Sequence, residues 1–483
     1  MIITRFAPSP TGFVHVGSLR TALYCYLFAK KNKGKFILRI EDTDRERYVE
    51  GAVENLIKVL NHFDLTYDEG PYVQSKRLPI YEEHAQKLIK SGHAYYCFCT
   101  KDRLDKMRKS QEAKKQAPMY DRKCLDLPES EVQKLLKEKT PHVIRQKIPY
   151  TTIKFKDLIR GNVQFDGKNL DDQVLMKSDG YPTYHLSNVV DDHLMSVTHI
   201  IKGEEWLPSA PKLIELYKAF GWDIPYFAHL PLLLNEDRTK LSKRQGDVAV
   251  EDYMKKGYLK EAIINFVVFL GWNPGGGEEK EIYTLKELEE IFSLEKVHKA
   301  GAVFNIEKLD WFNWKWEKTI FEKEVEGKSP TQRAEKLYDL AKDHLKERKK
   351  DNFLLNALLT VEEKILKDPK ETAKNIDFYY TLPAYKKDLL THEKMKVDLN
   401  TAKKSLESAE EDLKKLDSWT QENLQQTLLK TVERLGMKNG QVLWPLRAAL
   451  SGLQFSPGVF EIAWVLGKEE SILRINKALN LLK

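Results

Sequence analysis

The chain has 483 residues, a length at which about three domains are expected, and its 42% hydrophobic and 31% charged residues are typical of a globular protein. Its four cysteines are too few for a disulfide framework, and no apolar run reaches the roughly 18 residues of a membrane-spanning helix. The N-terminus lacks a secretory signal, so we expect a cytoplasmic protein without a membrane partner, and the net charge of +7 permits a nucleic-acid partner without requiring one.

Strand and helix patterns alternate at the start of the chain. Ile2–Ala7 is a short apolar run that ends in a Pro/Gly turn, and apolar residues at helical spacing predict a helix over Val16–Lys31. Lys35–Ile40 then reads as a buried strand, and Val49–Phe63 as a second helix. This alternation predicts an α/β fold with a parallel sheet and right-handed crossovers.

The pattern becomes irregular from about Tyr81 to Leu186, which we interpret as an insertion in the sheet domain. The α/β pattern returns and continues to about Leu234, and a helical region begins near Lys240. Beyond Gly327–Pro330 the chain is rich in charged residues, with leucines at helical spacing, which predicts a solvated helical bundle.

The first candidate site lies where the first strand meets the first helix. A helix N-terminus near Gly17 offers unpaired N–H groups and a positive dipole end, which favour phosphate binding. His15, just ahead of that helix, can donate to a phosphate oxygen, and Gly17 allows a flat ring to approach the backbone. Judged by spacing alone, a plain strand–turn–helix corner with a surface histidine explains these residues equally well.

The second candidate site is the basic run Lys240–Arg244. Three cations on a short loop suit a triphosphate whose charge shifts as pyrophosphate leaves. A five-residue basic run by itself is more often an ordinary solvated turn. The pairing of the two sites favours the functional interpretation, because one opens the sheet domain and the other follows its last strand.

A third candidate site is a cysteine cluster inside the expected insertion. Cys97 and Cys99 form a Cys-x-Cys pair, and Cys124 follows at a distance that resembles half of a structural zinc site. The alternative is three buried thiols without a metal.

These motifs carry a resemblance to a known family. His15–Ser18 and Lys240–Arg244 resemble the two signatures of class I aminoacyl-tRNA synthetases. The flanking segments are similar to glutamyl-tRNA synthetases in particular, and they are Arg5–Gly12, Ile40–Asp44, Tyr181–Leu186, Asn188–Asp192, Gly203–Trp206 and, near the C-terminus, Pro445–Gly452. The glutaminyl enzymes usually have Pro and Glu where this chain has Ala7 and Ser9.

The resemblance implies a two-step reaction with ATP and Mg²⁺, L-glutamate and tRNA(Glu). The α-carboxylate of glutamate attacks the α-phosphate of ATP, and a ribose hydroxyl at the tRNA 3′-end then takes the glutamyl group. The alternative is a non-discriminating enzyme that also glutamylates tRNA(Gln), since Val361–Lys364 contains no arginine that could read the last anticodon base. A tRNA-binding relative without catalysis would have lost the signature residues, which are all present. We expect a monomer.

The resemblance also implies the roles of the site residues. The expected catalytic residues are His15, Gly17, Lys240 and Lys243. The expected ATP-binding residues are Ser18, Glu205, Leu233, Ser242 and Arg244. The expected glutamate-binding residues are Arg5, Ala7, Ser9, Glu41, Tyr184, Asn188 and Lys202.

Three of these residues, Arg5, Glu41 and Lys202, leave an alternative open. From the residues alone, Arg5 and Glu41 could equally form a surface ion pair at adjacent strand ends. Lys202 stands where the family usually has Arg, so it keeps the charge and loses the fork that binds a carboxylate twice.

The resemblance implies a Rossmann-like catalytic domain with an inserted acceptor-binding domain, followed by an all-α anticodon-binding region. The expected boundaries are 1–80 with 187–239 for the catalytic domain, 81–186 for the insertion, 240–325 for a stem-contact helical domain, and 326–380 and 381–483 for two anticodon-binding modules. In this family a structural zinc ion is held in the insertion by thiols such as Cys97, Cys99 and Cys124, with Tyr120 or Asp126 as the fourth ligand.

Overall fold

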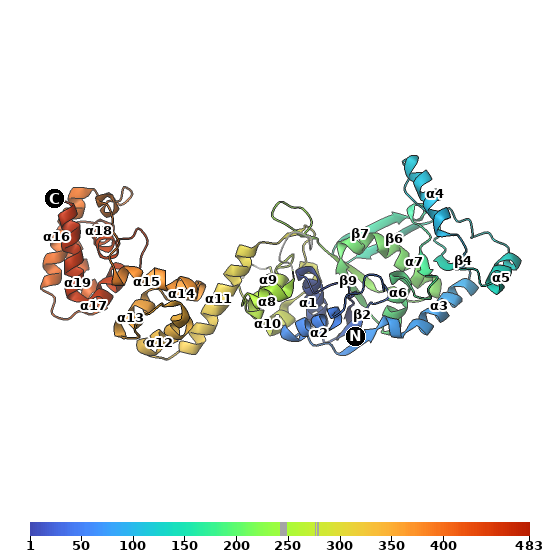
Figure 1. The fold of residues 1–483 in the computed structure, drawn as a ribbon, viewed down its shortest axis with the longest axis horizontal. Coiled ribbons are helices and arrows are strands. Elements are labelled where there is room, and N and C mark those ends of the chain that lie inside the picture. The colour runs from blue at the N-terminus through green and yellow to red at the C-terminus, as the bar shows by residue number, and fades with distance from the viewer. Residues whose placement is uncertain (242–248, 276, 278–279) are drawn as a thin grey trace. The chain divides into compact units, whose positions relative to one another are not determined.

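The computed structural model describes residues 1–241, 249–275, 277 and 280–483, which Figure 1 draws as a ribbon. The chain divides into two compact units, Met1–Asn313 and Trp314–Lys483. The division falls inside helix α11 (Ile306–Val325), whereas the sequence analysis placed its boundary at the end of that helix. Among the described helices, none has both the length and the apolar character that crossing a membrane requires.

A mainly parallel sheet organises the first unit, with the strand order β3-β2-β1-β9-β10-β6-β7. Only the pair β6·β7 at one edge is antiparallel. In that order the strands are Glu69–Val73, Lys35–Ile40, Ile3–Phe6, His199–Gly203, Tyr226–Leu230, Thr152–Asp157 and Gly161–Asp166. The strands β1 and β2 are buried along almost their whole length, as expected for the centre of a sheet that is covered on both faces. The predicted α/β architecture is confirmed.

Helices cover both faces of this sheet. On one face α1 (Val16–Lys31) lies against β1, where the Thr4 hydroxyl donates to the carbonyl of Cys25 over 2.8 Å. The opposite face packs against α3 (Leu78–Lys90), α6 (Tyr184–Leu194) and α7 (Ala210–Phe220), with Ile37 and Val189 in the shared core. Because the strands are parallel, their carboxyl ends and the loops that follow them gather along one edge.

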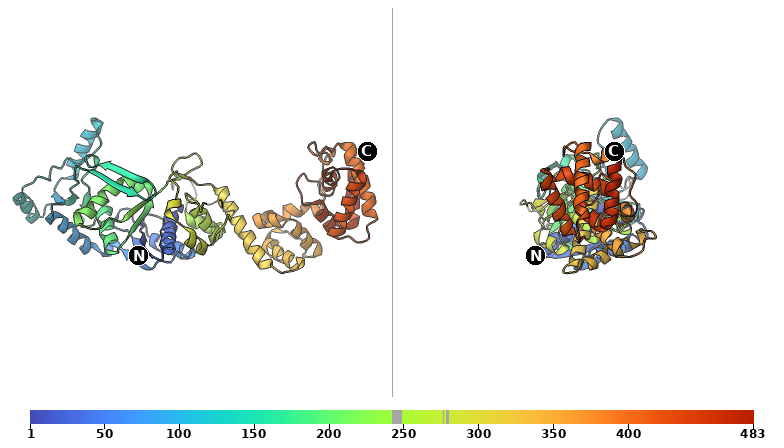
Figure 2. Two further views of the ribbon diagram at one scale, coloured as in Figure 1. Left: turned by 180° about the vertical axis from the view of Figure 1, so that it is seen from behind. Right: turned by 90° about the vertical axis from the view of Figure 1, so that its left-hand side faces the viewer.

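The stretch 81–186 contributes to two different sheets. A separate antiparallel sheet contains β4 (Ala94–Cys97), β5 (Val143–Gln146) and β8 (Val174–Met176), and its connections contain α4 (Lys101–Ala113) and α5 (Glu129–Lys137). The hairpin β6·β7 instead extends the mainly parallel sheet, with Phe227 in β10 paired to Asp157. The hairpin is visible as two blue-green arrows in the left view of Figure 2.

The remaining elements of the first unit are α2 (Ala52–His62), β11 (Leu233–Leu234), α8 (Val250–Lys255), α9 (Lys260–Val268), α10 (Leu285–Ile291) and β12 (Ala302–Val303). Among them, α9 and α10 pack against α1. The buried Arg20 in α1 donates to the carbonyls of Leu270 at 3.1 Å and Pro231 at 2.5 Å. The hydroxyl of Tyr24 donates to the carbonyl of Val268 at 2.9 Å. These bonds fix the position of the α1 N-terminus relative to the sheet.

The second unit is all-helical, as predicted. Its helices are α12 (Pro330–Ala341), α13 (Asn352–Thr360), α14 (Glu362–Lys367), α15 (Thr372–Tyr380), α16 (Leu399–Lys414), α17 (Gln421–Leu435), α18 (Asn439–Ser451) and α19 (Val459–Leu481). One hydrophobic core continues across the expected module boundary at 380/381. The buried Arg474 in α19 links the two sides, because its guanidinium donates to the carbonyls of Phe378, Tyr379 and Leu450 at 2.7 to 3.0 Å.

Candidate active site

A cavity of about 500 Å³ lies at the carboxyl ends of β1, β2 and β9, beside the N-terminus of α1. Most of the residues expected to bind substrate come together in its walls. Those that line it are Arg5, Ala7, Ser9, His15, Gly17, Ser18, Glu41, Lys202, Glu205, Leu233 and Lys240. Tyr184 and Asn188 lie directly behind this wall, where they contact Lys202 and Glu41.

The N-terminus of α1 forms one wall of the cavity. His15 is the N-cap residue: its Nδ1 accepts from the backbone N–H of Ser18 at 3.3 Å, and its Nε2 lies 2.9 Å from the Ser18 hydroxyl. A Cβ at Gly17 would lie 3.0 Å from the His15 ring, so a larger residue would displace that ring. The N-terminal residues of α1 and the His15 side chain therefore form this wall together, and a helix N-terminus favours the binding of anions.

Only the first two residues of the second basic motif are described. Lys240 and Leu241 line the cavity, and Lys240 forms a β-bridge with Leu234. On the far side of the motif, Ala249 forms a β-bridge with His15. Ser242, Lys243 and Arg244 lie outside the described residues, and both ends of the segment that contains them adjoin the cavity wall.

A buried charge network lies beneath the opposite wall. The Nε of Arg5 donates to Asp192 at 3.0 Å, and Arg39 donates to the same carboxylate at 2.7 Å. Arg39 also donates to Oε1 of Glu41 at 3.0 Å, and Asn188 donates to that oxygen at 3.1 Å. Arg5 therefore pairs with Asp192 in the interior, and the surface ion pair between Arg5 and Glu41 does not form.

Three polar atoms of this network are buried and have no hydrogen-bond partner among the described residues: Nη2 of Arg5, Nε of Arg39 and Oδ1 of Asn188. The nearest anion to Nε of Arg39 is Asp191, at 3.9 Å. An unpaired buried donor costs free energy, on the order of 1–3 kcal/mol. Arg5 lines the cavity, so a carboxylate bound there would satisfy its guanidinium.

Lys202, at the end of β9, is held between two aromatic rings. Its ammonium lies 4.0 Å from the ring centre of Tyr184 and 4.1 Å from that of Trp206, and it donates to the Tyr184 hydroxyl at 2.9 Å. Burial lowers the pKa of Lys202 to about 8, an effect that the nearby Glu41 partly opposes. This ammonium therefore loses its charge at a pH far closer to neutrality than an ordinary lysine does.

Glu205 is placed at the cavity by Gly203. A Cβ at Gly203 would overlap the Glu205 carboxylate, so the glycine leaves the space that this side chain occupies. Leu233, in β11, contributes an apolar surface to the same cavity, and its side chain lies near Gly17.

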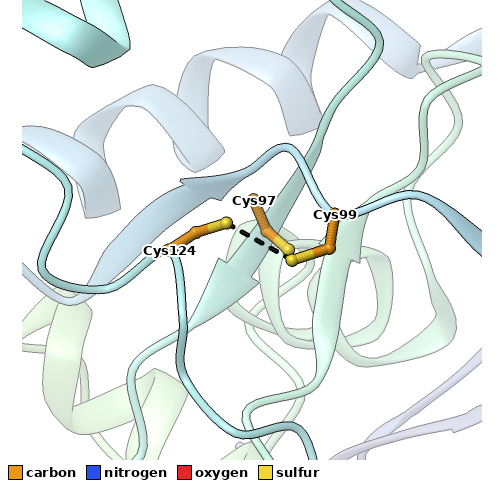
Figure 3. Close-up of side chains that lie close together, drawn as sticks. All are labelled: Cys97, Cys99 and Cys124. Carbon is orange, nitrogen blue, oxygen red and sulfur yellow. Dashed lines mark hydrogen bonds between the residues drawn. The ribbon is translucent and has the colours of Figure 1, made fainter. Parts of the chain in front are cut away.

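The cysteine cluster lies in the insertion, away from this cavity. Figure 3 shows the side chains of Cys97, Cys99 and Cys124 directed toward one another, and their sulfurs all lie within 4.8 Å of one another. The Tyr120 hydroxyl lies 3.3 Å from the sulfur of Cys97 and 3.4 Å from that of Cys99. Asp126 is exposed and is not part of this group. Of the two expected fourth ligands, the structure brings Tyr120 to the sulfurs.

Positive charge surrounds the cluster. The guanidinium of Arg103 donates to the Cys99 sulfur at 3.5 Å, and that of Arg145 lies 4.1 Å from the ring centre of Tyr120. Contact with the Cys124 thiol, followed by that with Tyr120, lowers the pKa of the Cys97 thiol well below its ordinary value. The same contact raises the pKa of the Cys124 thiol, and burial raises that of the Tyr120 phenol, so thiolate is favoured at Cys97 in particular. Three thiols and a phenolic oxygen form a donor set that fits a tetrahedral zinc ion.

Comparisons with known proteins agree with this geometry. Residues 1–311 match the family of class I tRNA synthetases (E and Q), catalytic domain, and residues 336–479 match the anticodon binding domain family. A glutamate–tRNA ligase of Clostridium botulinum (strain Loch Maree) is 47% identical over 493 aligned residues, which cover 99% of this chain and 98% of that protein. The chain belongs to the glutamate–tRNA ligase family.

Other glutamate–tRNA ligases support the assignment. The enzyme of Chloroherpeton thalassium is 47% identical to this chain, with 99% of the chain and 98% of the relative covered. A crystal structure of a glutamate tRNA ligase from Elizabethkingia meningosepticum, in complex with its amino acid, superposes with a TM-score of 0.75 at 38% identity, covering 100% of both chains.

Three residues of this glutamate–tRNA ligase site were missed by the sequence analysis: Arg39, Asp192 and Trp206. Arg39 interrupts an apolar strand, and Asp192 follows the buried Val189 and Val190. A charge inside a buried run is itself a signal, because buried charges are almost always paired. Trp206 had no comparable signal, since its role depends on a contact with Lys202.

Proposed function

We propose that the cavity binds L-glutamate and ATP with Mg²⁺, forms glutamyl-adenylate, and passes the glutamyl group to the 3′-end of tRNA(Glu). The chain is a glutamate–tRNA ligase by family. The observation that carries the site assignment is the buried Arg5, which lines the cavity together with Glu41 and Lys202 and whose Nη2 has no hydrogen-bond partner among the described residues. Since this reaction serves protein synthesis, we further propose a cytoplasmic enzyme that acts as a monomer.

Glutamate has two carboxylates and one ammonium, and the cavity offers a complement to each. Arg5 supplies a planar fork for a carboxylate, and Lys202 supplies a second, point-like cation. Glu41 supplies the anion for the ammonium, since both of its described hydrogen bonds end on Oε1 and leave Oε2 for the substrate. Tyr184 and Asn188 hold Lys202 and Glu41 in place, and Ala7 and Ser9 line the same wall.

The phosphates of ATP belong at the other wall. The α1 N-terminus, His15 and Ser18 offer donors to phosphate oxygens, and Lys240 adds positive charge. Gly17 leaves room for the adenosine beside Leu233, and Glu205 is in reach of its polar groups. Catalysis then consists of positioning the glutamate carboxylate against the α-phosphate and stabilising the charge that moves onto pyrophosphate, to which Ser242, Lys243 and Arg244 contribute.

The function is tested by charging purified tRNA(Glu) and tRNA(Gln) side by side with labelled glutamate and ATP. We expect glutamate on tRNA(Glu), with release of AMP and pyrophosphate. Glutamine is the matched control and should not be charged, because its neutral amide cannot pair with Arg5 and Lys202. Comparable charging of tRNA(Gln) would instead establish the non-discriminating enzyme, and the absence of charging on both tRNAs would contradict the proposed function.

We also propose that Cys97, Cys99, Cys124 and Tyr120 hold a zinc ion. Bound zinc would stabilise the insertion by joining the loop after β4 to the segment around Cys124. Its distance from the substrate cavity in sequence and structure gives it no part in the chemical steps.

Protein purified without chelator is therefore expected to contain about one zinc per chain, and Cys97→Ser is expected to lose it. Tyr120→Phe should weaken zinc binding about 10- to 100-fold, because it removes one oxygen donor and keeps the ring. Asp126→Asn is the matched control and should bind zinc like the parent. Metal analysis and competition with a coloured chelator provide the measurements. A metal-free protein that is folded and charges at the full rate would refute the zinc site.

A further inference from the structure

Two adjacent aspartates on α6 are completely buried, and they accept hydrogen bonds from different partners, although Asp191 also lies 3.9 Å from Nε of Arg39. Asp191 accepts hydrogen bonds from Gln74 at 3.0 Å, Arg77 at 3.0 Å and Tyr81 at 2.8 Å. These three side chains come from the segment that leads into α3 and from α3 itself, and they do not line the cavity. Asp191 therefore joins α6 to α3.

Asp192 instead binds the two arginines of the central strands. It accepts from Nε of Arg5 at 3.0 Å and from Nη1 of Arg39 at 2.7 Å. Arg5 pairs with Ile37 in the parallel register of β1 and β2, and Arg39 lies two residues further along β2. Side chains two residues apart share a face of a strand, so both guanidinium groups are on the face that α6 covers. One carboxylate thus hydrogen-bonds to both of these neighbouring buried cations.

The hydrogen bonds that Asp192 accepts leave the terminal nitrogens of Arg5 available to a substrate. Asp192 takes Nε of Arg5, the inner nitrogen, so the terminal nitrogens point onward and Nη2 is left without a partner among the described residues. Arg39 donates to Asp192 through Nη1, which orients its guanidinium, and it donates to Glu41 through Nη2, which orients that carboxylate. Arg5, the cation of the glutamate site, is therefore bonded directly to Asp192, and Glu41, its anion, is connected to Asp192 through Arg39.

We propose that Asp192 is a positioning residue that orients both ends of the glutamate site, Arg5 directly and Glu41 through Arg39. The inference rests on the proposed function, because it takes glutamate as the ligand of Arg5 and Glu41. A neutral side chain at this position would weaken the compensation of two neighbouring guanidinium groups, because Arg5 would lose the one carboxylate that it bonds among the described residues, while Arg39 would keep Glu41 at 3.0 Å and Asp191 at 3.9 Å. Their repulsion would turn Arg5 and Arg39 away from their present directions, and a small misplacement is sufficient to weaken substrate binding.

The test compares Asp192→Asn with Asp191→Asn, two isosteric changes at adjacent and equally buried carboxylates. In steady-state charging of tRNA(Glu), Asp192→Asn should raise KM for glutamate at least about tenfold and leave KM for ATP within about twofold of the parent. Asp191→Asn should leave both constants within about twofold, although its melting temperature falls by a similar amount. Loss of stability alone does not produce this split between the two substrates.

Arg39→Lys is the second variant, and it keeps the test decisive if Asp192→Asn does not fold. A single ammonium cannot bridge Asp192 and Glu41 as the fork does, so KM for glutamate should again rise while KM for ATP is kept. A folded Asp192→Asn or Arg39→Lys protein with an unchanged KM for glutamate would overturn the positioning role. An equal rise in Asp191→Asn would also overturn it. If the parent charges tRNA with glutamate and the variants have the same KM for glutamate as the parent, only this inference fails. If the parent does not charge tRNA with glutamate, the proposed function itself fails.

Discussion

Lys243→Ala is expected to slow formation of glutamyl-adenylate by about 10²–10³-fold and to leave tRNA binding unchanged. The physical reason is that pyrophosphate gains negative charge as the α-phosphate is attacked, and a cation placed at that charge lowers the energy of the transition state more than that of the bound substrate. Lys243 belongs to the basic motif that begins at Lys240 in the cavity wall, and Ala249, beyond that motif, forms a β-bridge with the cavity residue His15.

The measurement is single-turnover adenylate formation at saturating ATP, glutamate and tRNA, together with a separate tRNA-binding titration. Lys255→Ala is the matched control, because it removes an exposed lysine from α8 that does not line the cavity. The control should react at the parent rate. A Lys243→Ala protein whose rate stays within about twofold of the parent would remove this residue from the catalytic set.

Lys202→Met is expected to raise KM for glutamate by about 10- to 150-fold, since it removes a charge-assisted contact to a carboxylate and keeps the length of the side chain. In the parent, KM for glutamate should also rise as the pH increases from 7 to 9. Burial lowers the pKa of Lys202 to about 8, so its ammonium is charged below that pH and neutral above it. The attraction for the substrate carboxylate is therefore present at the lower pH and lost at the higher one.

Lys202→Arg distinguishes the effect of the Lys202 titration from that of every other titrating group in the assay. Guanidinium stays charged over the whole range and can form two parallel bonds to a carboxylate, so its KM should be lower than that of the parent and independent of pH from 7 to 9. The charged groups that act on Lys202 are Glu41, Arg5, Asp192 and Arg39, and they are the same in both proteins. Identical pH profiles for the parent and Lys202→Arg would mean that Lys202 does not contact glutamate.

Local sequence patterns were sufficient for the elements that frame the cavity. The predicted helix Val16–Lys31 and the predicted strand Lys35–Ile40 have the bounds of α1 and β2. Such elements follow from the spacing of apolar residues, and a parallel sheet brings the carboxyl ends of its strands together whatever the detailed packing. The resemblance to the family implied that residues as distant in the chain as Ser9, Glu41 and Lys240 belong to one site, and they line one cavity.

The other features of the fold and of the site depend on contacts between segments that are distant in the chain. The sequence by itself determined the family, the α/β and all-α architectures, and the residues that surround the cavity, because these depend on motifs and on local periodicity. Only the tertiary structure decided that β6·β7 joins the catalytic sheet, that Tyr120 and not Asp126 adjoins the thiols, and that Asp192 holds Arg5 and Arg39. The physical reason is that a strand edge, a metal donor and a buried charge each take whichever partner the packing brings within about 3 Å, and that choice is not encoded in any short segment.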